Sequence, residues 1–207
     1  MSDPTPNGAQ SLIRTLVDSG VEVCFANPGT SEMHFVAALD EVPGMRAVLG
    51  LFEGVVTGAA DGYARIAGKP ACTLLHLGPG LGNGFANLHN ARRAHTPIVN
   101  IVGDHATYHK RFDAPLESDI DAVAGAVSTW VHRSMTPESA PTDGARAVAE
   151  AMRSPGGVAT LILPADVCWL ESTGPVGPVA TVGPAAVADD VLSTVADALR
   201  SGEPTLI

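Results

Sequence analysis

The sequence has few aromatic side chains, few charges and very little lysine. Aromatic residues make up 4% of the 207 residues and charged residues 16%, and the only lysines are Lys69 and Lys110. Twelve basic against 22 acidic residues give a formal net charge of −10, and the sequence has no basic run that would neutralise nucleic-acid phosphates. We therefore expect a core of aliphatic residues and no nucleic-acid partner.

Cysteine and long apolar runs are also scarce. The three cysteines, Cys24, Cys72 and Cys168, lie far apart in or beside apolar runs, which predicts buried free thiols in a reducing compartment rather than metal ligands. The N-terminal residues are polar, and no apolar run approaches 18 residues. These absences exclude a signal peptide and a membrane span, so we expect a cytoplasmic protein.

What the sequence does contain is a regular alternation of helical and buried-strand patterns. Continuous apolar strands separated by helices are typical of a parallel sheet covered on both faces. This predicts an α/β fold, a three-layer α/β/α sandwich with a six-stranded parallel sheet. The expected strands are residues 21–25, 46–51, 71–77, 97–102, 129–132 and 157–163. The expected helices are residues 8–19, a helix capped by Thr30 or Ser31 and running to 39, then 53–66, a helix ending at 93, 119–126 and 142–153.

The composition changes after this first domain, which we place at residues 1–170. Residues 171–184 are rich in glycine and proline and predict an extended linker. A helix with valine or leucine at every fourth position follows, and a strand is expected from Pro204. A helix and the beginning of a strand cannot form a core alone. We therefore expect residues 185–207 to be the start of a truncated second domain.

A glycine-rich loop is expected over residues 78–84, between a strand and a helix. It does not fit the dinucleotide-binding pattern G-x-G-x-x-G, because Asn83 or Phe85 stands where the third glycine is required. Pro79 also removes one backbone amide that could bind phosphate. The loop alone therefore does not predict a nicotinamide or flavin site.

Glu53 is the one acidic residue in the apolar stretch 49–56. It falls where a buried strand gives way to a helix, and burial of a carboxylate costs free energy unless the group is neutralised. A simpler interpretation is a glutamate in the first helical turn that accepts hydrogen bonds from backbone amides. The residues around Glu53 do not decide between the two.

The wider sequence resembles a known family at this point. Residues 51–65, from Leu51-Phe52-Glu53 to Gly62-Tyr63-Ala64-Arg65, are similar to the E-x-x-A-x-x-x-A-x-G-Y-A-R helix of thiamine-diphosphate-dependent 2-keto-acid enzymes. This is the family of acetolactate synthase, pyruvate oxidase and benzoylformate decarboxylase. Further segments resemble the family in the same order, and together they cover about residues 8–168; they are residues 25–30, 78–83, 97–103 and 157–167.

The resemblance implies that this is the pyrimidine-binding (PYR) domain of such an enzyme, with thiamine diphosphate as cofactor. Glu53 would bond N1′ of the aminopyrimidine and act in catalysis. Mg²⁺ would be held by a diphosphate-binding domain that this chain lacks, so no metal ligand is expected here and the chain alone is expected to be inactive. A homodimer or tetramer through the PYR domain is implied. The implied cofactor-binding residues are Asn27, Pro28, Gly29, Glu53, Val56, Gly80 and Asn83.

The branch of the family is less well defined. Benzoylformate decarboxylase resembles this chain in having Leu-His where Leu75-His76 stands, and Asn-Pro-Gly-Ser at residues 27–30. By that likeness His76 would be a catalytic acid or base and Thr30 would contact the 2-keto-acid substrate, whereas an ordinary structural histidine is the alternative. Acetolactate synthases have a Gln where Leu116 stands, which puts that activity and a bound flavin in doubt. A free-standing PYR subunit that assembles with a separate diphosphate-domain chain is the second hypothesis, and a non-catalytic relic is the third.

Overall fold

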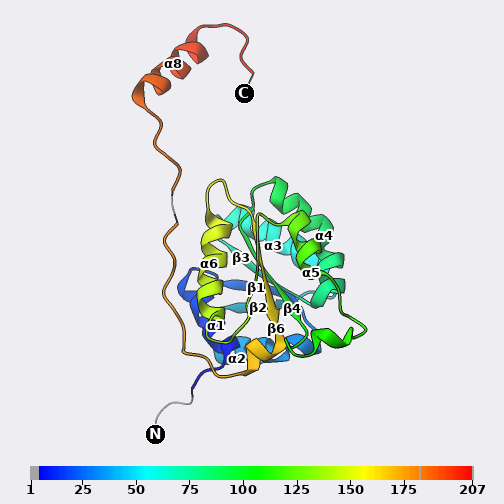
Figure 1. The fold of residues 1–207 in the computed structure, drawn as a ribbon. Coiled ribbons are helices and arrows are strands. Elements are labelled where there is room, and N and C mark those ends of the chain that lie inside the picture. Colours follow the sequence, from blue (N-terminus) through cyan, green and yellow to red (C-terminus); the bar gives the residue numbers. More distant parts are fainter. Residues whose placement is uncertain (1–4, 182, 207) are drawn as a thin grey trace.

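The computed structural model describes residues 5–181 and 183–206, and its centre is one six-stranded sheet (Figure 1). The strands pair in the order β2-β1-β3-β4-β6-β5, and every pair is parallel. The expected α/β fold with six parallel strands is confirmed. The strands are β1 (Val23–Asn27), β2 (Arg46–Leu49), β3 (Ala71–Leu75), β4 (Ile98–Asp104), β5 (Trp130–Arg133) and β6 (Val158–Pro164).

Helices cover both faces of this sheet. One face packs against α1 (Gly8–Asp18), α2 (Met33–Glu41), α6 (Ala140–Met152) and α7 (Ala165–Trp169), and the other against α3 (Glu53–Ala67), α4 (Leu77–Arg93) and α5 (Ile120–Val127). Two short 3₁₀ helices, η1 (Thr30–Glu32) and η2 (Lys110–Phe112), interrupt the connections. The helices therefore form the two outer layers that the alternating pattern predicted.

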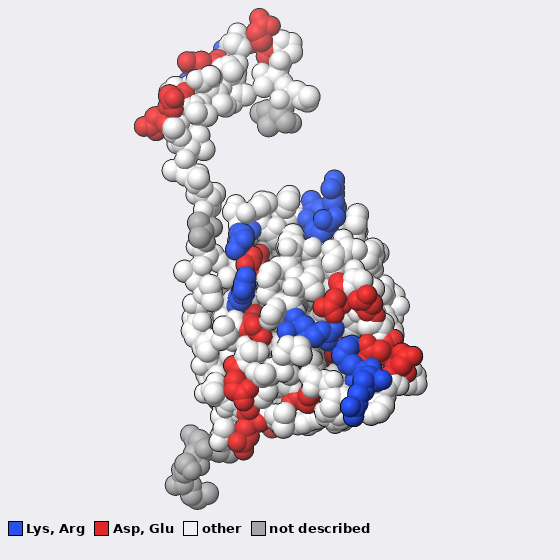
Figure 2. All heavy atoms as spheres, in the orientation of Figure 1, with Lys and Arg blue, Asp and Glu red and all other residues white. Residues whose placement is uncertain are grey.

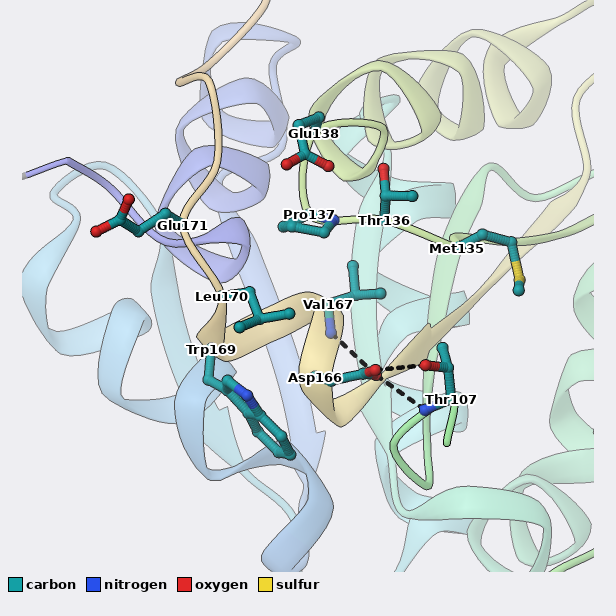
Figure 3. Close-up of a pocket in the computed structure, with 10 residues that line it drawn as sticks. All are labelled: Thr107, Met135, Thr136, Pro137, Glu138, Asp166, Val167, Trp169, Leu170 and Glu171. Carbon is teal, nitrogen blue, oxygen red and sulfur yellow. Dashed lines mark hydrogen bonds between the residues drawn. The ribbon is translucent and has the colours of Figure 1, made fainter. Parts of the chain in front are cut away.

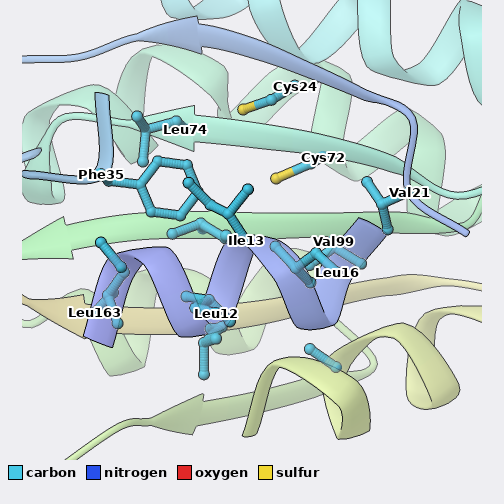
Figure 4. Close-up of a cluster of buried hydrophobic side chains, with 14 of the residues drawn as sticks. Leu12, Ile13, Leu16, Val21, Cys24, Phe35, Cys72, Leu74, Val99 and Leu163 are labelled. Atoms are coloured by element: carbon cyan, nitrogen blue, oxygen red, sulfur yellow. The ribbon is translucent and has the colours of Figure 1, made fainter. Parts of the chain in front are cut away.

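The two cores follow from the alternation of side chains along each strand. In β3, Cys72 and Leu74 enter the core under α1, whereas Ala71 and Leu75 enter the core under α3 and α4. Figure 4 shows Cys24 and Cys72 on neighbouring strands among these aliphatic side chains. All three cysteines are free and buried, as predicted. The central strands β3, β4 and β6 are buried on both faces and are therefore mostly apolar.

The glycine-rich segment is the main difference from the predicted elements. Residues 78–84 are not a loop: α4 begins at Leu77 and contains all of them. Pro79 is tolerated because the amides of the first helical turn have no partner within the helix. Several of the glycines lie where a side chain would collide with a neighbouring element. These glycines therefore allow close packing. Because the segment is helical, the prediction of a loop was wrong.

The expected cap by Thr30 or Ser31 was also wrong. Both residues lie within η1, and the N-cap of α2 is Glu32, which makes no side-chain capping bond. Helix α7 (Ala165–Trp169) was not expected, because five residues are too few to show a helical period. The remaining helices of the domain begin and end within about two residues of the predicted positions.

The C-terminal segment leaves the domain as an extended chain. No helix or strand occurs in residues 172–181 or 183–188, and α8 (Asp189–Arg200) follows (Figure 1). Residues 204–206 form no strand, contrary to expectation, and residue 207 lies outside the described residues. Among the helices described, none is long and apolar enough to cross a membrane. On the face shown in Figure 2, acidic and basic side chains of the domain lie next to one another.

Candidate functional site

The chain changes direction across the sheet between β1 and β3. From β1 it passes through α2 to β2 on one side, and then returns through α3 to β3 on the other side of β1. Ligands of open α/β sheets bind at the carboxyl ends of the strands at such a switch point. Asn27 is the last residue of β1, and His76 directly follows β3. The topology thus brings the residues predicted after these two strands to one place.

Glu53 is the first residue of α3 and reaches this same edge. Its side chain is largely buried, at 8% exposure, and its Oε2 accepts a hydrogen bond of 3.0 Å from Asn83 Nδ2 on α4. A Cβ added at Gly80 would lie 3.1 Å from Glu53 Oε1 and 3.5 Å from the Cβ of His76. Gly80 therefore lies between Glu53 and His76, and its missing side chain leaves Oε1 open to a ligand.

Close contact between α3 and α4 holds this arrangement. Thr57 Oγ1 donates to the backbone oxygen of Gly84 at 3.1 Å, and Asn87 Nδ2 donates to that of Gly54 at 2.6 Å. A Cβ on Gly84 would come within 2.8 Å of Thr57 Cγ2. Glycine at position 84 therefore lets the two helices approach closely enough for Asn83 to reach Glu53.

His76 makes a second group of contacts at the end of β3. Its Nδ1 lies 2.8 Å from Glu32 Oε2, and the same carboxyl oxygen accepts a 2.7 Å bond from the backbone N–H of Gly29. A Cβ on Gly29 would lie 2.4 Å from both Nδ1 and Cε1 of the imidazole. The ring thus lies directly against the Gly29 backbone, and glycine is required there by this contact.

Glu32 is the residue of this site that the sequence did not reveal. It is 2% exposed, and its Oε1 is buried without a hydrogen-bond partner. A Cβ on Gly103 would lie 1.7 Å from that oxygen, so β4 leaves space for the carboxyl group. Burial raises the pKa of Glu32 above its usual range, although the Gly29 amide and His76 oppose the shift. A glutamate in a polar turn is ordinarily solvated, and only the fold shows that this one is buried.

The remaining predicted residues surround these groups. Asn27 Nδ2 donates to the Gly50 carbonyl at 2.7 Å, and Val56 is buried against Gly50. Pro28 is half-buried, whereas Thr30 is exposed at the start of η1. The structure therefore gathers Asn27, Gly29, Glu53, Val56, His76, Gly80 and Asn83 at the carboxyl ends of β1 and β3, with Pro28 and Thr30 in the adjoining turn.

The surroundings of Glu53 differ from the expectation. Its apolar neighbours in the sequence, Leu51, Phe52, Val55 and Val56, were expected to remove its carboxylate from water. Leu51, Phe52 and Val55 are instead 89%, 49% and 60% exposed, and only Val56 of these four residues is buried. Leu51, Phe52 and Val55 are thus exposed apolar side chains close to Glu53 in the sequence, and Val55 lines a separate small hollow beside β2. The open oxygen of the largely buried Glu53 carboxyl group could share a hydrogen bond with a ring nitrogen.

A large hollow lies elsewhere on the same edge of the sheet. It has a volume of about 770 Å³ and is bordered by α7 and by the segments after β4 and β5 (Figure 3). Asp166 in its wall accepts hydrogen bonds from the backbone N–H of Thr107 and of Val167, at 3.0 and 3.2 Å. None of its lining residues belongs to the predicted site. The Asp166 carboxyl group in its wall is thus already paired with Thr107 and Val167, and none of the residues predicted to act on a ligand faces this hollow.

The residues at β1 and β3 fit the aminopyrimidine part of thiamine diphosphate better than its diphosphate. An open oxygen on a largely buried carboxyl group suits a ring nitrogen. No group of three or more His, Cys, Asp or Glu side chains that could hold a metal ion occurs in residues 5–181 and 183–206. A diphosphate with its cation would therefore have to be held by residues other than these.

Comparisons with known proteins support the same kind of site. The profile of a family described as thiamine pyrophosphate enzyme, N-terminal TPP binding domain, matches residues 6–124. A Mycobacterium tuberculosis protein provisionally named acetolactate synthase large subunit IlvX is 66% identical over 97% of this chain. Benzoylformate decarboxylase of Pseudomonas aeruginosa is 32% identical over 71% of the chain.

The structural comparison finds the same kind of protein. A thiamine diphosphate-dependent 4-hydroxybenzoylformate decarboxylase from Rhodococcus jostii RHA1 superposes with a TM-score of 0.84 over 94% of this chain, at 25% identity. The chain spans 38% of the length of the M. tuberculosis protein, 28% of the P. aeruginosa protein and 37% of the R. jostii chain.

Proposed function

Because this chain belongs to the thiamine pyrophosphate enzyme family, through the N-terminal TPP binding domain that residues 6–124 match, we propose that it forms the aminopyrimidine-binding half of a thiamine diphosphate site. The observation that carries the proposal is the Glu53 carboxyl group, which is held by Asn83 at 3.0 Å and is open at Oε1 above Gly80. Asn27, Pro28, Gly29 and Val56 are proposed to complete the binding surface.

Glu53 would act by holding a proton at N1′ of the bound ring. The cofactor, when bound, supplies a nucleophilic carbon and an electron sink for reactions of 2-keto acids. A largely buried carboxyl group interacts strongly with a single ring nitrogen because little water competes for it. Asn83 fixes one carboxyl oxygen, so the other is directed at the ligand.

His76 would move protons at the substrate. Its Nδ1 is fixed by Glu32, which leaves Nε2 for a bond to a carboxylate or carbonyl oxygen. The imidazole is 23% exposed, so the ring remains accessible. Thr30, exposed at the adjoining turn, is proposed to contact the carboxylate of the substrate. Together these groups support decarboxylation of a 2-keto acid.

Carboligation of 2-keto acids is the second candidate. It is favoured by the 66% identity to the relative provisionally named acetolactate synthase large subunit. The His76–Glu32 pair favours the decarboxylase, because benzoylformate decarboxylase resembles this chain in having a histidine at that position. A screen of 2-keto acids that measures both released carbon dioxide and condensed product separates the two.

The assembled enzyme is proposed to be a cytoplasmic homodimer or tetramer in which Mg²⁺ is held by a diphosphate-binding domain. The exposed apolar side chains of Leu51, Phe52 and Val55 support a partner surface near the start of α3. Helix α8 is proposed to belong to a following domain, with residues 171–184 as the linker. Its apolar side chains are exposed here, and the match to the M. tuberculosis relative covers 201 residues.

The proposal is tested by Glu53→Gln in the full-length gene product loaded with thiamine diphosphate and Mg²⁺. Without the carboxyl group no acid can hold the N1′ proton, so exchange of the C2 proton of the bound cofactor should slow by about 10²-fold or more. Hydrogen–deuterium exchange followed by NMR after acid quench measures this rate. Unchanged exchange would disprove the role of Glu53.

Asp61→Asn is the matched control on the same helix. Asp61 pairs with Arg65 at 2.8 Å and accepts from Thr96 Oγ1 at 2.7 Å, away from the site. Its replacement should lower stability while C2 exchange stays at the wild-type rate. Equal losses of exchange in both variants would indicate a general effect on folding.

A further inference from the structure

The backbone turns through a left-handed conformation directly after His76. Among residues 5–181 and 183–206, three residues other than glycine have positive φ angles: Leu77 at 50°, His95 at 56° and Asp113 at 47°. His95 and Asp113 are polar and exposed, and such residues adopt this conformation at modest cost. Leu77 is apolar and fully buried. A bulky apolar side chain in this region is a true outlier, and residues of this kind cluster at functional sites.

This turn joins the two halves of the site. Strand β3 ends at Leu75 and α4 begins at Leu77, so His76 is the sole linking residue. The N–H of Gly80 donates to the carbonyl of His76 at 2.8 Å and closes the first turn of α4. The His76 ring meets Gly29 and Glu32 on one side of this turn, and Gly80 meets Glu53 on the other.

We infer that Leu77 is a positioning residue: its left-handed backbone, anchored by its buried side chain, sets the direction of the His76 imidazole toward Glu32 and Gly29. The inference deepens the proposed function. It rests on that function only in assuming that the oriented His76 imidazole acts on the substrate. A regular right-handed start to α4 would change the direction in which the chain leaves His76. Glycine would adopt the same φ without strain, but it has no side chain to hold the turn in place.

The test compares Leu77→Met with Leu77→Ile in the 207-residue chain. Both substitutions keep an apolar side chain of similar size, but branching at Cβ makes a positive φ much less favourable for isoleucine. The readout is the NMR cross-peak between His76 Hε1 and the Hα protons of Gly29, which the ring-on-backbone contact should produce. We expect Leu77→Met to keep the peak and Leu77→Ile to weaken it at least several-fold. Equal peaks in both variants would overturn the inference.

Two more variants keep the test decisive. His95→Ile places the same branched residue at the exposed positive-φ position and should lower stability without changing the His76 peak. A comparable loss of the peak there would overturn the inference, since destabilisation alone would then account for it. If Leu77→Ile does not fold, Leu77→Gly decides: we expect it to fold and to lose intensity at His76, and full intensity would show that the side chain is no anchor.

These measurements do not depend on the proposed activity. In the full-length enzyme, Leu77→Met should retain the wild-type rate with 2-keto acids, whereas Leu77→Ile should lower kcat more than it raises KM. If the cross-peak changes but His76→Ala leaves every rate unchanged, the proposed role of His76 fails while the positioning by Leu77 stands. If His76→Ala lowers the rate but Leu77→Ile leaves the peak unchanged, the proposed role of His76 stands and the positioning by Leu77 fails.

Discussion

The carboxyl group of Glu32 is buried at the switch point of the sheet with only part of its hydrogen-bonding capacity used. Oε2 is bonded to the Gly29 amide and to His76, whereas Oε1 has no partner. Such a group is costly when ionised unless its partner is charged. The carboxyl group is thus held in a buried position against the imidazole that is proposed to act on the substrate.

This burial predicts how stability depends on pH. Burial holds the pKa of Glu32 above its ordinary value of 4.5, so the native state keeps this proton at pH values where the unfolded chain has lost it. Where the native state binds more protons, the free energy of unfolding falls as pH rises. That loss should occur from about pH 4.5 up to the native pKa of Glu32. Above this range the loss should be complete and constant.

Glu32→Gln should remove this contribution, since glutamine does not titrate and can still accept a hydrogen bond from Gly29. Urea unfolding at a series of pH values measures the difference between wild type and variant. We expect the variant to gain stability relative to wild type as pH rises through this range. Parallel curves from pH 4 to 7 would contradict the assigned burial of an ionisable group, whatever the absolute stabilities.

At the level of single residues the sequence predicts only part of this site. Glu53 and His76 are recognisable because each interrupts or ends an apolar run, where a polar side chain requires a reason. Glu32 stands in a turn of polar residues, where an acid is ordinarily solvated. The contact that buries it comes from Gly103, which is 71 positions away (103 − 32) and on another strand.

At the level of elements, α4 shows what local rules miss. Residues 78–84 contain four glycines and one proline, which by intrinsic propensity favour a loop. They are helical because the interface with α3 stabilises the helix and requires small residues. Tertiary packing thus overrides propensity at the segment that carries Gly80 and Asn83. The strands and the other long helices were predictable because their apolar periods agree with their packing.

Two alanine substitutions in α4 should separate these effects. In Gly84→Ala the new methyl group would lie 2.8 Å from Thr57 Cγ2 and 3.4 Å from Leu75 Cδ1. Such overpacking should cost about 1–3 kcal/mol of unfolding free energy, partly offset by alanine's advantage in a helix. In Gly82→Ala nothing lies within 4 Å of the new methyl group, so only that advantage of about 1 kcal/mol remains. Chemical denaturation should therefore give opposite signs for the two variants, and equal signs would contradict the close packing of α3 on α4.

At the level of the whole molecule, topology explains why the site is where it is. The crossing from β2 through α3 to β3 forms the switch point, and the alternation of strands and helices in the sequence was enough to predict the sheet. The order of the strands was not evident from the periods alone. The C-terminal segment is different, because Pro204 to Leu206 is apolar in pattern yet has no partner strand to pair with.

The segment after α7 is attached to the domain by a few specific hydrogen bonds. Ser172 donates its N–H to the Pro6 carbonyl at 2.9 Å and its hydroxyl to the Pro137 carbonyl at 2.8 Å. The N–H of Val176 donates to Thr15 Oγ1 at 3.0 Å. Helix α8, in contrast, has no buried residue. The first ten residues of this segment therefore stabilise the domain, whereas the helix should not.

Two shortened chains test this division. A chain that ends at residue 181 keeps the three hydrogen bonds and should unfold within about 0.5 kcal/mol of the full chain. A chain that ends at residue 170 loses all three, and at about 1 kcal/mol each its unfolding free energy should fall by about 2–3 kcal/mol. Equal stability of the two shortened chains would mean that the segment is not held to the domain, and a large loss in the longer one would mean that α8 packs against it.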